Sequence, residues 1–320
     1  HIFLIYNMNN WESILPKSLD FFGKVSEFEF NFQGYDISAD NWKYRRAHMN
    51  AHMLKEFHRI NAKNKIDVVV GYFSGYTVDP HVLLNMSDQG VAIFNFNWDD
   101  KLWFKGGKIS GQYSGLASIA PFVDLNLTNA PDSCIKYLAE GGLSMFWPEG
   151  ADADIHKPYD HDFEFDVTFV GGRYGWRPKL IEILRKSGIS VTCYGDGWEN
   201  PSLLEKEMIE IYSKSRINLG FSGVGYSSRL MCLKGRDFEV PMSGGLYLTQ
   251  NNPELSLVDD VGAEILTYDN AKDCINKIKW VLNNPVIAKK IRENGRVAAL
   301  ERHTWKGRFK DIFQLSNFIN

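Results

Sequence analysis

Two cations and one carboxylate lie close together in the segment KGRDFEVPMSGGLYLTQNNPEL, residues 234–255. Lys234 and Arg236 stand at the start of a short predicted helix that ends near Gly244. Cations there oppose the helix dipole and are unfavourable unless an anion such as a diphosphate binds beside them. Glu239 follows Arg236 by three residues on the same face, and its carboxylate suits hydrogen bonding to two vicinal hydroxyls, as in a ribose. The segment therefore favours a nucleotide site, with a solvated helix carrying an Arg–Glu pair as the alternative.

A second candidate for phosphate binding is the glycine-rich turn that follows the predicted strand DVTFV. Gly171 and Gly172 open this turn, and Arg177 stands where the next helix begins. Backbone N–H groups of such a turn approach a phosphate at the positive helix end, and Arg177 adds a charge. The spacing is not G-x-G-x-x-G, and no acidic residue is suitably placed about 20 residues later, so a nicotinamide or flavin site is disfavoured. A tight turn that needs positive φ is the alternative.

Strands must alternate with helices to position these residues. Short apolar runs rich in Ile, Val and Phe separate longer helical patterns along the chain, which predicts an α/β fold of two doubly wound parallel sheets. The predicted strands are 2–6, 28–32, 66–70, 91–96, 123–128, 166–170, 189–194, 217–221, 246–249 and 263–268. The predicted helices are 41–61, 131–141, 177–187, 201–214 and two or three more after Ala271.

The chain is expected to divide within residues 148–165. This segment has two prolines, six acidic residues and no apolar run, and a buried strand is predicted directly after it, as expected of a linker. A chain of 320 residues also exceeds the size at which one core usually stops growing. We therefore expect one domain over 1–155 and a second over 156–303, with ligands bound beyond the carboxyl ends of the strands.

Composition excludes several classes of protein. The formal net charge is −3 and the cations are scattered, so no basic face for nucleic acid is indicated. Cys134, Cys193, Cys232 and Cys274 form no C-x-x-C pair, so neither a zinc knuckle nor a disulfide framework is expected. No apolar run approaches the roughly 18 to 20 residues of a membrane span. We expect a cytoplasmic protein; peripheral membrane association and the oligomeric state stay open.

Several segments resemble the glycosyltransferase family that includes the CgeB spore maturation proteins. The resemblance is spread over most of the chain and is most specific in the C-terminal half. It implies a GT-B fold: two Rossmann-like domains that face a central cleft, the second of the glycosyl-transferases-group-1 type. It also implies that a last helix at about 304–320 packs back on the N-terminal domain. The segments are NFNWDD (95–100), WPEGADADIHKPY (147–159), FDVTFVGGRYG (165–175), RDFEVPMSGGLYLT (236–249) and NPVIAKKIRENGRVAALERHTWKGR (284–308).

The resemblance also implies roles in binding a nucleotide-sugar donor. The Glu at the position of Glu239 grips the donor ribose, and the basic residues ahead of it neutralise the diphosphate. The Gly244–Gly245 turn and residues 249–251 would lie beside the phosphates and the transferred sugar, and YGDGW (194–198) would lie near the nucleobase. The expected donor-binding residues are Gly171, Gly172, Arg177, Tyr194, Gly195, Arg229, Lys234, Arg236, Glu239, Ser243, Gly244, Gly245 and Thr249.

The sequence departs from related retaining families at one position. Many of them carry a second Glu eight residues before the ribose Glu, and Met231 stands there, so retention or inversion of the sugar stays open. An inverting transfer needs a general base, and Asp99 and Asp100 follow a predicted strand end that faces the cleft. A helix cap or turn pair is their alternative role. Glu149 and His81 are weaker candidates for the base.

Three other features are given structural interpretations. His48 and His52 are spaced as metal ligands on a helix, but no HExxH pattern accompanies them, so a surface or core-edge helix is favoured. Asp152 and Asp154 spell DAD in the linker and are expected to be solvated acids rather than a metal site. The aromatic residues Trp98, Trp103 and Phe104 suit either stacking on a sugar or acceptor, or buried packing.

These observations predict a metal-independent glycosyltransferase that moves a sugar from a nucleotide-diphosphate sugar to a glycan, protein or other acceptor. No cofactor is expected beyond the donor substrate. Lys234 and Arg236, together with a base at Asp99 or Asp100, form the predicted catalytic set. The alternatives are a nucleotide-sugar epimerase, which needs no acceptor, and a catalytically silent protein that binds nucleotide sugars or glycans.

Overall fold

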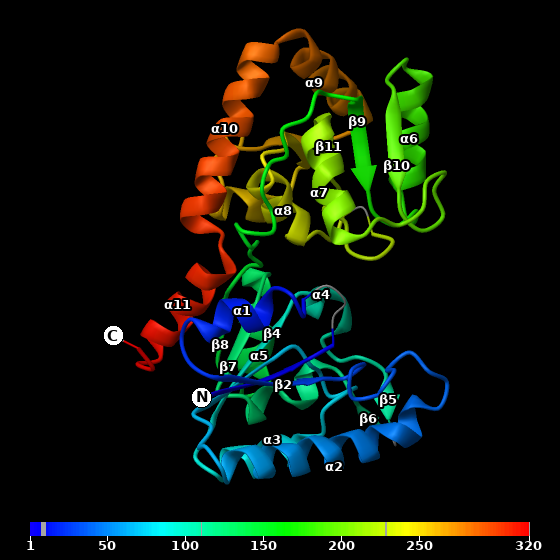
Figure 1. Ribbon diagram of the computed structural model, residues 1–320. Helices are drawn as coiled ribbons and strands as arrows, with labels where there is room; N and C mark the ends of the chain where they lie inside the picture. Colours follow the sequence, from blue (N-terminus) through cyan, green and yellow to red (C-terminus); the bar gives the residue numbers. More distant parts are fainter. Residues whose placement is uncertain (8–10, 110, 228, 320) are drawn as a thin grey trace. The chain divides into compact units, whose positions relative to one another are not determined.

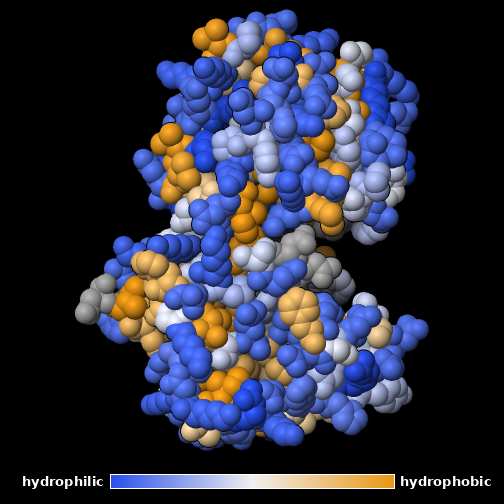
Figure 2. Space-filling model, viewed as in Figure 1, coloured by the Kyte–Doolittle hydropathy of each residue, from blue (hydrophilic) through white to orange (hydrophobic). Residues whose placement is uncertain are grey.

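The computed structural model describes residues 1–7, 11–109, 111–227 and 229–319. The chain divides into two compact units, His1–Pro148 and Glu149–Asn320, and each has its own parallel sheet and apolar core (Figure 1). On the face seen in Figure 2, the surface of both units is mostly hydrophilic, with scattered apolar patches. The packing of residues 304–320 on the first unit stays a prediction.

The first unit has a six-stranded parallel sheet in the order β2-β1-β3-β4-β7-β8. The order reverses between β1 and β3, and ligands bind beyond the carboxyl ends of strands at such a point. Its strands are β1 (Ile2–Tyr6), β2 (Val25–Glu29), β3 (Val68–Gly71), β4 (Ala92–Asn97), β7 (Leu125–Thr128) and β8 (Ser144–Phe146), with a hairpin of β5 (Lys108–Ile109) and β6 (Gln112–Tyr113). Its helices are α1 (Leu15–Asp20), α2 (Trp42–Asn61), α3 (Pro80–Ser87), α4 (Asp100–Trp103) and α5 (Cys134–Ala139).

The second unit has a five-stranded parallel sheet in the order β10-β9-β11-β12-β13. The corresponding reversal lies between β9 and β11. Its strands are β9 (Phe165–Val170), β10 (Val191–Tyr194), β11 (Ser215–Leu219), β12 (Tyr247–Gln250) and β13 (Leu266–Tyr268). Its helices are α6 (Arg177–Lys186), α7 (Glu205–Lys214), α8 (Gly235–Met242), α9 (Ala271–Asn283), α10 (Pro285–Arg302) and α11 (Trp305–Leu315).

The predicted α/β class is confirmed, but one predicted strand has the wrong bounds and some short elements were not predicted. The strand expected at 28–32 is β2, Val25–Glu29. Its end is set by Glu29, whose carboxylate accepts the backbone N–H of Phe32 and closes a turn, although the alternation of Phe and polar residues continues beyond it. Helix α3 and strand β8 were not predicted, because eight and three residues show too little periodicity.

Helix α8 begins with a buried carboxylate. Lys234 is the N-cap residue, and its backbone N–H donates to Asp237 Oδ2 at 2.8 Å. Asp237 is only 1% exposed, and burial raises the pKa of its carboxyl to about 7, despite the hydrogen bond from Lys234. The first turn of α8 is therefore held by a group whose charge is costly in the folded protein.

This buried carboxyl predicts a pH-dependent stability. An Asp in an unfolded chain has a pKa of ~3.9, whereas folding raises that of Asp237 to about 7. Between these values the folded state binds the extra proton, so stability falls as the pH rises, by at most about 4 kcal/mol for this one group. Asp237→Asn removes this charge and keeps an oxygen for the Lys234 N–H. We expect urea unfolding from pH 5 to pH 8 to show a smaller loss of stability in Asp237→Asn than in the wild type.

The exposed Asp260 is the matched control, because it lies in the same unit. Asp260→Asn should follow the wild-type curve at every pH. Equal pH dependence of Asp237→Asn and the wild type would show that the buried carboxyl does not control the stability of this unit.

Candidate functional site

Five polar side chains gather where the carboxyl ends of β9 and β11 meet the first turn of α8. They form what we call the polar cluster: Tyr212 from α7, Arg236 and Glu239 from α8, and Tyr247 and Thr249 from β12. Helices that follow parallel strands begin at the carboxyl edge of the sheet, which places Arg236 and Glu239 there, and Tyr212 joins them from the last turn of α7. Arg236 and Glu239 were predicted from the sequence, and the cluster brings them together with Thr249.

Arg236 carries a half-buried charge at the centre of this cluster. Burial lowers the pKa of its guanidinium, but Tyr212, Glu239 and Tyr247 outweigh that effect and hold the pKa above its usual value. Its Nε is buried without a hydrogen-bond partner in the described part of the chain. Buried donors without partners are rare and costly. The arrangement is therefore suited to a ligand that presents oxygen acceptors.

Gly235, the first residue of α8, lies against two carboxylates. A Cβ at this position would lie 2.9 Å from Glu149 Oε2 and 3.1 Å from Glu239 Oε1. The close approach explains why glycine separates Lys234 from Arg236. The two carboxylates leave room at residue 235 for a hydrogen atom but not for a Cβ. Since both lie against Gly235, Glu149 lies beside the Glu239 side chain. Sequence reasoning treated Glu149 only as a weak candidate for a base.

Gly220, directly after β11, makes the second close approach. A Cβ there would lie 2.2 Å from the Tyr247 hydroxyl and 2.5 Å from Thr249 Oγ1. Tyr268 donates a hydrogen bond to the Gly220 carbonyl at 2.7 Å, and Thr249 Oγ1 is buried. Sequence reasoning missed Gly220, Tyr212 and Tyr247. The only signal for Gly220 was a glycine that interrupts the predicted strand INLGF.

Arg177 supports the glycine-rich turn after β9. Its Nη1 donates to the Gly172 carbonyl at 2.9 Å, and its guanidinium lies 3.9 Å from the centre of the Tyr174 ring. Burial lowers the pKa of this guanidinium. The Gly171 carbonyl accepts a hydrogen bond from Trp198 Nε1 at 2.8 Å. The turn is thus held by side chains from both of its flanks, and Arg177 is partly engaged in holding it.

Ser243, Gly244 and Gly245 lie at the far end of α8 from Lys234. Ser243 Oγ donates to the Glu239 carbonyl at 2.7 Å, and Gly244 has a φ of +74°. These residues end the helix ahead of β12, on the side where that strand begins. The structure therefore does not bring them together with the first turn of α8.

Three further predicted residues lie apart from the polar cluster. Arg229 is exposed in the connection between β11 and α8, and its backbone N–H donates to Ser227 Oγ. The ring of Tyr194 lies 6.4 Å from that of Phe165, at the beginning of β9. Gly195 donates its backbone N–H to the Asn200 carbonyl within the turn after β10.

In the first unit, the two aspartates after β4 have different environments. Asp100 is fully buried and accepts hydrogen bonds from Thr128 Oγ1 at 2.5 Å and Ser133 Oγ at 3.0 Å. Burial raises the pKa of its carboxyl. Asp99 is exposed, and the Tyr72 hydroxyl approaches its Oδ2 at 3.4 Å. Of the predicted pair, Asp99 is the one whose carboxylate faces a ligand-sized space.

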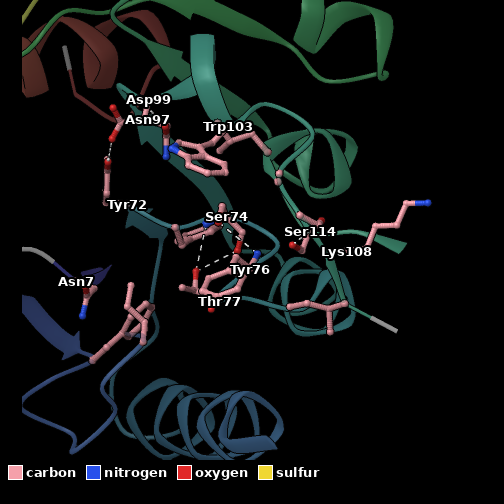
Figure 3. Close-up of a pocket in the computed structure, with 18 of the residues that line it drawn as sticks. Asn7, Tyr72, Ser74, Tyr76, Thr77, Asn97, Asp99, Trp103, Lys108 and Ser114 are labelled. Carbon is pink, nitrogen blue, oxygen red and sulfur yellow. Dashed lines mark hydrogen bonds between the residues drawn. The ribbon is translucent and has the colours of Figure 1, made fainter. Parts of the chain in front are cut away.

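That space is a cavity of about 680 Å³, which we call the Asp99 cavity. It opens at the carboxyl ends of β1, β3 and β4, the reversal point of the first sheet (Figure 3). Its volume lies within the range of about 300–1,000 Å³ typical of small-molecule sites. Its aromatic lining is Phe30, Tyr72, Phe73, Tyr76 and Trp103, and its polar lining includes Asn7, Ser74, Thr77, Asn97, Asp99 and Ser114.

The histidine and acidic pairs considered from the sequence do not form a metal site. Among the residues that the structure describes, no group of three or more His, Cys, Asp or Glu side chains is placed to hold a metal ion. His52 lies against Tyr35, with Nδ1 3.2 Å from its hydroxyl. Asp154 is exposed, but the expectation of a solvated Asp152 is wrong. Asp152 is buried because its Oδ1 accepts two backbone N–H groups of its own turn.

Every helix in the described part of the chain is too short or too polar to span a lipid bilayer.

Comparison with known proteins identifies the fold. Residues 177–314 match the family described as glycosyl transferase-like, and no curated protein matches the chain. HepE of Anabaena, crystallised with UDP and glucose, is 11% identical, with a TM-score of 0.69 and all of both chains covered. Sucrose-phosphate synthase of Thermosynechococcus elongatus is 12% identical, with a TM-score of 0.67 over 99% of this chain and 98% of that one.

A putative UDP-N-acetylglucosamine 2-epimerase from Listeria monocytogenes is also similar, at 14% identity and a TM-score of 0.52 over 100% of this chain and 97% of that one. Identities this low carry information on the fold and not on the reaction. The chain therefore has the GT-B fold, and within it residues 177–314 are similar to the glycosyl transferase-like family.

Proposed function

We propose that this protein is a glycosyltransferase that moves a sugar from a nucleoside-diphosphate sugar to an acceptor hydroxyl. One observation carries the proposal: the half-buried Arg236, whose Nε has no partner in the described part of the chain, lies beside Glu239 in the glycosyl transferase-like domain. A guanidinium suits a diphosphate, and a carboxylate suits the two hydroxyls of a ribose. Thr249, whose hydroxyl lies beside that of Tyr247 against Gly220, offers a further polar contact.

In the proposed transfer, the acceptor oxygen bonds to the anomeric carbon of the donor sugar. The bond from that carbon to the terminal phosphate oxygen breaks, and its electrons leave with the nucleoside diphosphate. Lys234 and Arg236 stabilise the negative charge that develops on this leaving group. The acceptor hydroxyl loses its proton to a base, and we assign that role to Asp99 in an inverting transfer. Asp100 is less suited, because both of its oxygens already accept hydrogen bonds.

We further propose that the transfer needs no metal, because Lys234 and Arg236 supply cationic charge at the donor. We place the chain among the CgeB-like transferases on the strength of the segments around 165–175 and 236–249. A cytoplasmic location fits the free cysteines Cys134, Cys193, Cys232 and Cys274.

A nucleotide-sugar epimerase is the second candidate, since the Listeria protein of that description shares the fold. The epimerase and the transferase differ in whether they need an acceptor. An epimerase interconverts a donor when no acceptor is present, whereas a transferase releases nucleoside diphosphate in proportion to the acceptor added. Following both products in one reaction distinguishes them.

The first prediction concerns donor binding. We expect one of UDP, GDP, CDP, ADP and dTDP to raise the melting temperature, with UDP tested first because HepE was crystallised with it. At about 100 times its dissociation constant, a nucleotide adds roughly 2.7 kcal/mol of stability. Glu239→Ala should abolish the rise, because the ribose loses its carboxylate partner. A rise of equal size in Glu239→Ala would remove Glu239 from the donor site.

The second prediction concerns turnover. Arg236→Ala should lower kcat/KM by about 100- to 1,000-fold, the usual effect of losing one group that stabilises charge in a transition state. Arg236→Lys keeps the charge but loses the planar fork, so it should retain an intermediate rate.

Initial rates of nucleotide release measure these effects, and circular dichroism checks that the variants fold. The exposed Lys272 on α9 supplies the matched control, since Lys272→Ala removes a cation of the same unit without touching the polar cluster. Wild-type turnover in Arg236→Ala would refute the assigned role.

A further inference from the structure

A second carboxylate lies beside Glu239 in the second unit. Glu149 Oε2 and Glu239 Oε1 both lie against Gly235, where a Cβ would be 2.9 Å from the first oxygen and 3.1 Å from the second. The two oxygens are therefore at most about 6 Å apart, a separation that two neighbouring hydroxyls of one ligand can bridge with hydrogen bonds. Both side chains are half-buried, so a ligand can still reach them.

The backbone of Glu149 is held in place from the start of α11. Arg308 Nε donates to the Glu149 carbonyl at 3.3 Å. Two residues further along, the Ala151 N–H donates to the His303 carbonyl at 2.8 Å, and the Trp305 N–H donates to the Ala151 carbonyl at 3.2 Å. The backbone that carries this carboxylate is therefore fixed next to α8, as a binding residue requires.

The residue that anchors this segment is itself held on both sides of its ring. His303 is buried, with Arg308 Nη2 2.9 Å from its Nδ1 and Asp259 Oδ1 3.0 Å from its Nε2. A guanidinium can only donate, so Nδ1 accepts from Arg308 and Nε2 donates to Asp259. The ring also packs on Phe238 of α8, with ring centres 5.1 Å apart. These contacts tie the attachment of Glu149 to α8.

Two neighbouring carboxylates favour a ligand that donates hydrogen bonds. Ionised carboxylates only accept, and two of them repel one another. Arg236 offsets part of the repulsion, since Glu239 helps to hold the pKa of its guanidinium above the usual value. Among the described residues, no third His, Cys, Asp or Glu joins the pair to form a metal site. A sugar diol, which donates two O–H groups, suits the pair.

The ribose of the donor is the diol nearest to this pair. The proposed function places the ribose at Glu239, and Glu149 lies against the same Gly235. A diol that meets the carboxylate of Glu239 is therefore within reach of the carboxylate of Glu149.

We propose that Glu149 and Glu239 each accept one of the two ribose hydroxyls of the donor, which makes Glu149 a specificity-determining residue. This inference rests on the proposed function, and it names the class of donor: a ribonucleoside-diphosphate sugar rather than a 2′-deoxyribonucleoside one. A deoxyribose would leave one of the two carboxylates desolvated without a hydrogen-bond donor, and such a loss weakens binding.

The test compares the affinities of three nucleotides by titration calorimetry. The probes are UDP, 2′-deoxy-UDP and 3′-deoxy-UDP, or the same three forms of GDP, CDP or ADP where the melting experiment selects that base. We expect the wild type to bind the ribonucleotide about 10- to 100-fold more tightly than either deoxy form, the usual effect of losing a hydrogen bond to a charged group.

The variants assign one hydroxyl to each carboxylate. Glu149→Gln keeps the shape of the side chain but not its charge, so its preference for one of the two hydroxyls should fall about tenfold while the other preference stays. Glu239→Gln should show the complementary pattern. Glu293→Gln is the matched control, because Glu293 is exposed on α10 in the same unit, and it should keep both preferences.

The readout is the ratio of affinities, because a variant that merely loosens the fold weakens the binding of all three nucleotides alike. Wild-type ratios in Glu149→Gln, as in Glu293→Gln, would overturn the inference. A larger rise in melting temperature with dTDP than with any ribonucleotide would also overturn it, since dTDP lacks the 2′-hydroxyl.

Failure of this inference can be told apart from failure of the proposed function. A protein that binds a nucleotide through Glu239, but whose ratios do not change in Glu149→Gln, overturns this inference and leaves the proposed function intact. A protein that binds none of the nucleotides overturns the proposed function and this inference with it.

Discussion

The arrangement of the second unit depends on keeping Arg236 charged while it is half-buried. Desolvation disfavours a guanidinium in such a place, and the surrounding Tyr212, Glu239 and Tyr247 offset that cost. The compensation is incomplete, because the Nε has no partner among the described residues. A folded protein retains such a group when a ligand completes it. The chemistry proposed for this unit follows from that one unsatisfied cation.

Close backbone approaches make the polar cluster compact. Gly235 admits the carboxylates of Glu149 and Glu239, and Gly220 admits the hydroxyls of Tyr247 and Thr249. A Cβ at either glycine would lie within about 3 Å of these side-chain oxygens, so the groups would have to shift. The buried carboxyl of Asp237 then fixes the first turn of α8, which carries Arg236 and Glu239.

The first unit has the same type of parallel sheet but different residues at the point where its strand order reverses. Its reversal point lies between β1 and β3, and the cavity there is lined by aromatic rings together with Lys43 and Lys108. Asp99 and Asp100 are neighbours in sequence. Asp100 is buried and accepts hydrogen bonds from Thr128 and Ser133, whereas Asp99 borders the cavity. One carboxylate thus supports the fold, and the other remains available for chemistry.

The sequence by itself determined the α/β class, most strands and the pairing of Arg236 with Glu239, because these depend on local apolar runs and on helical spacing. It could not reveal short or capped elements such as β8 and α3, whose boundaries depend on single hydrogen bonds and edge positions. Only the tertiary structure decided that Tyr212, Gly220 and Tyr247 join Arg236. The tertiary structure also decided that Asp100 is buried and that Asp99 borders the cavity. The physical reason is that crossovers between parallel strands bring together side chains that are distant in sequence, and the direction in which each side chain points is fixed by packing that no local pattern encodes.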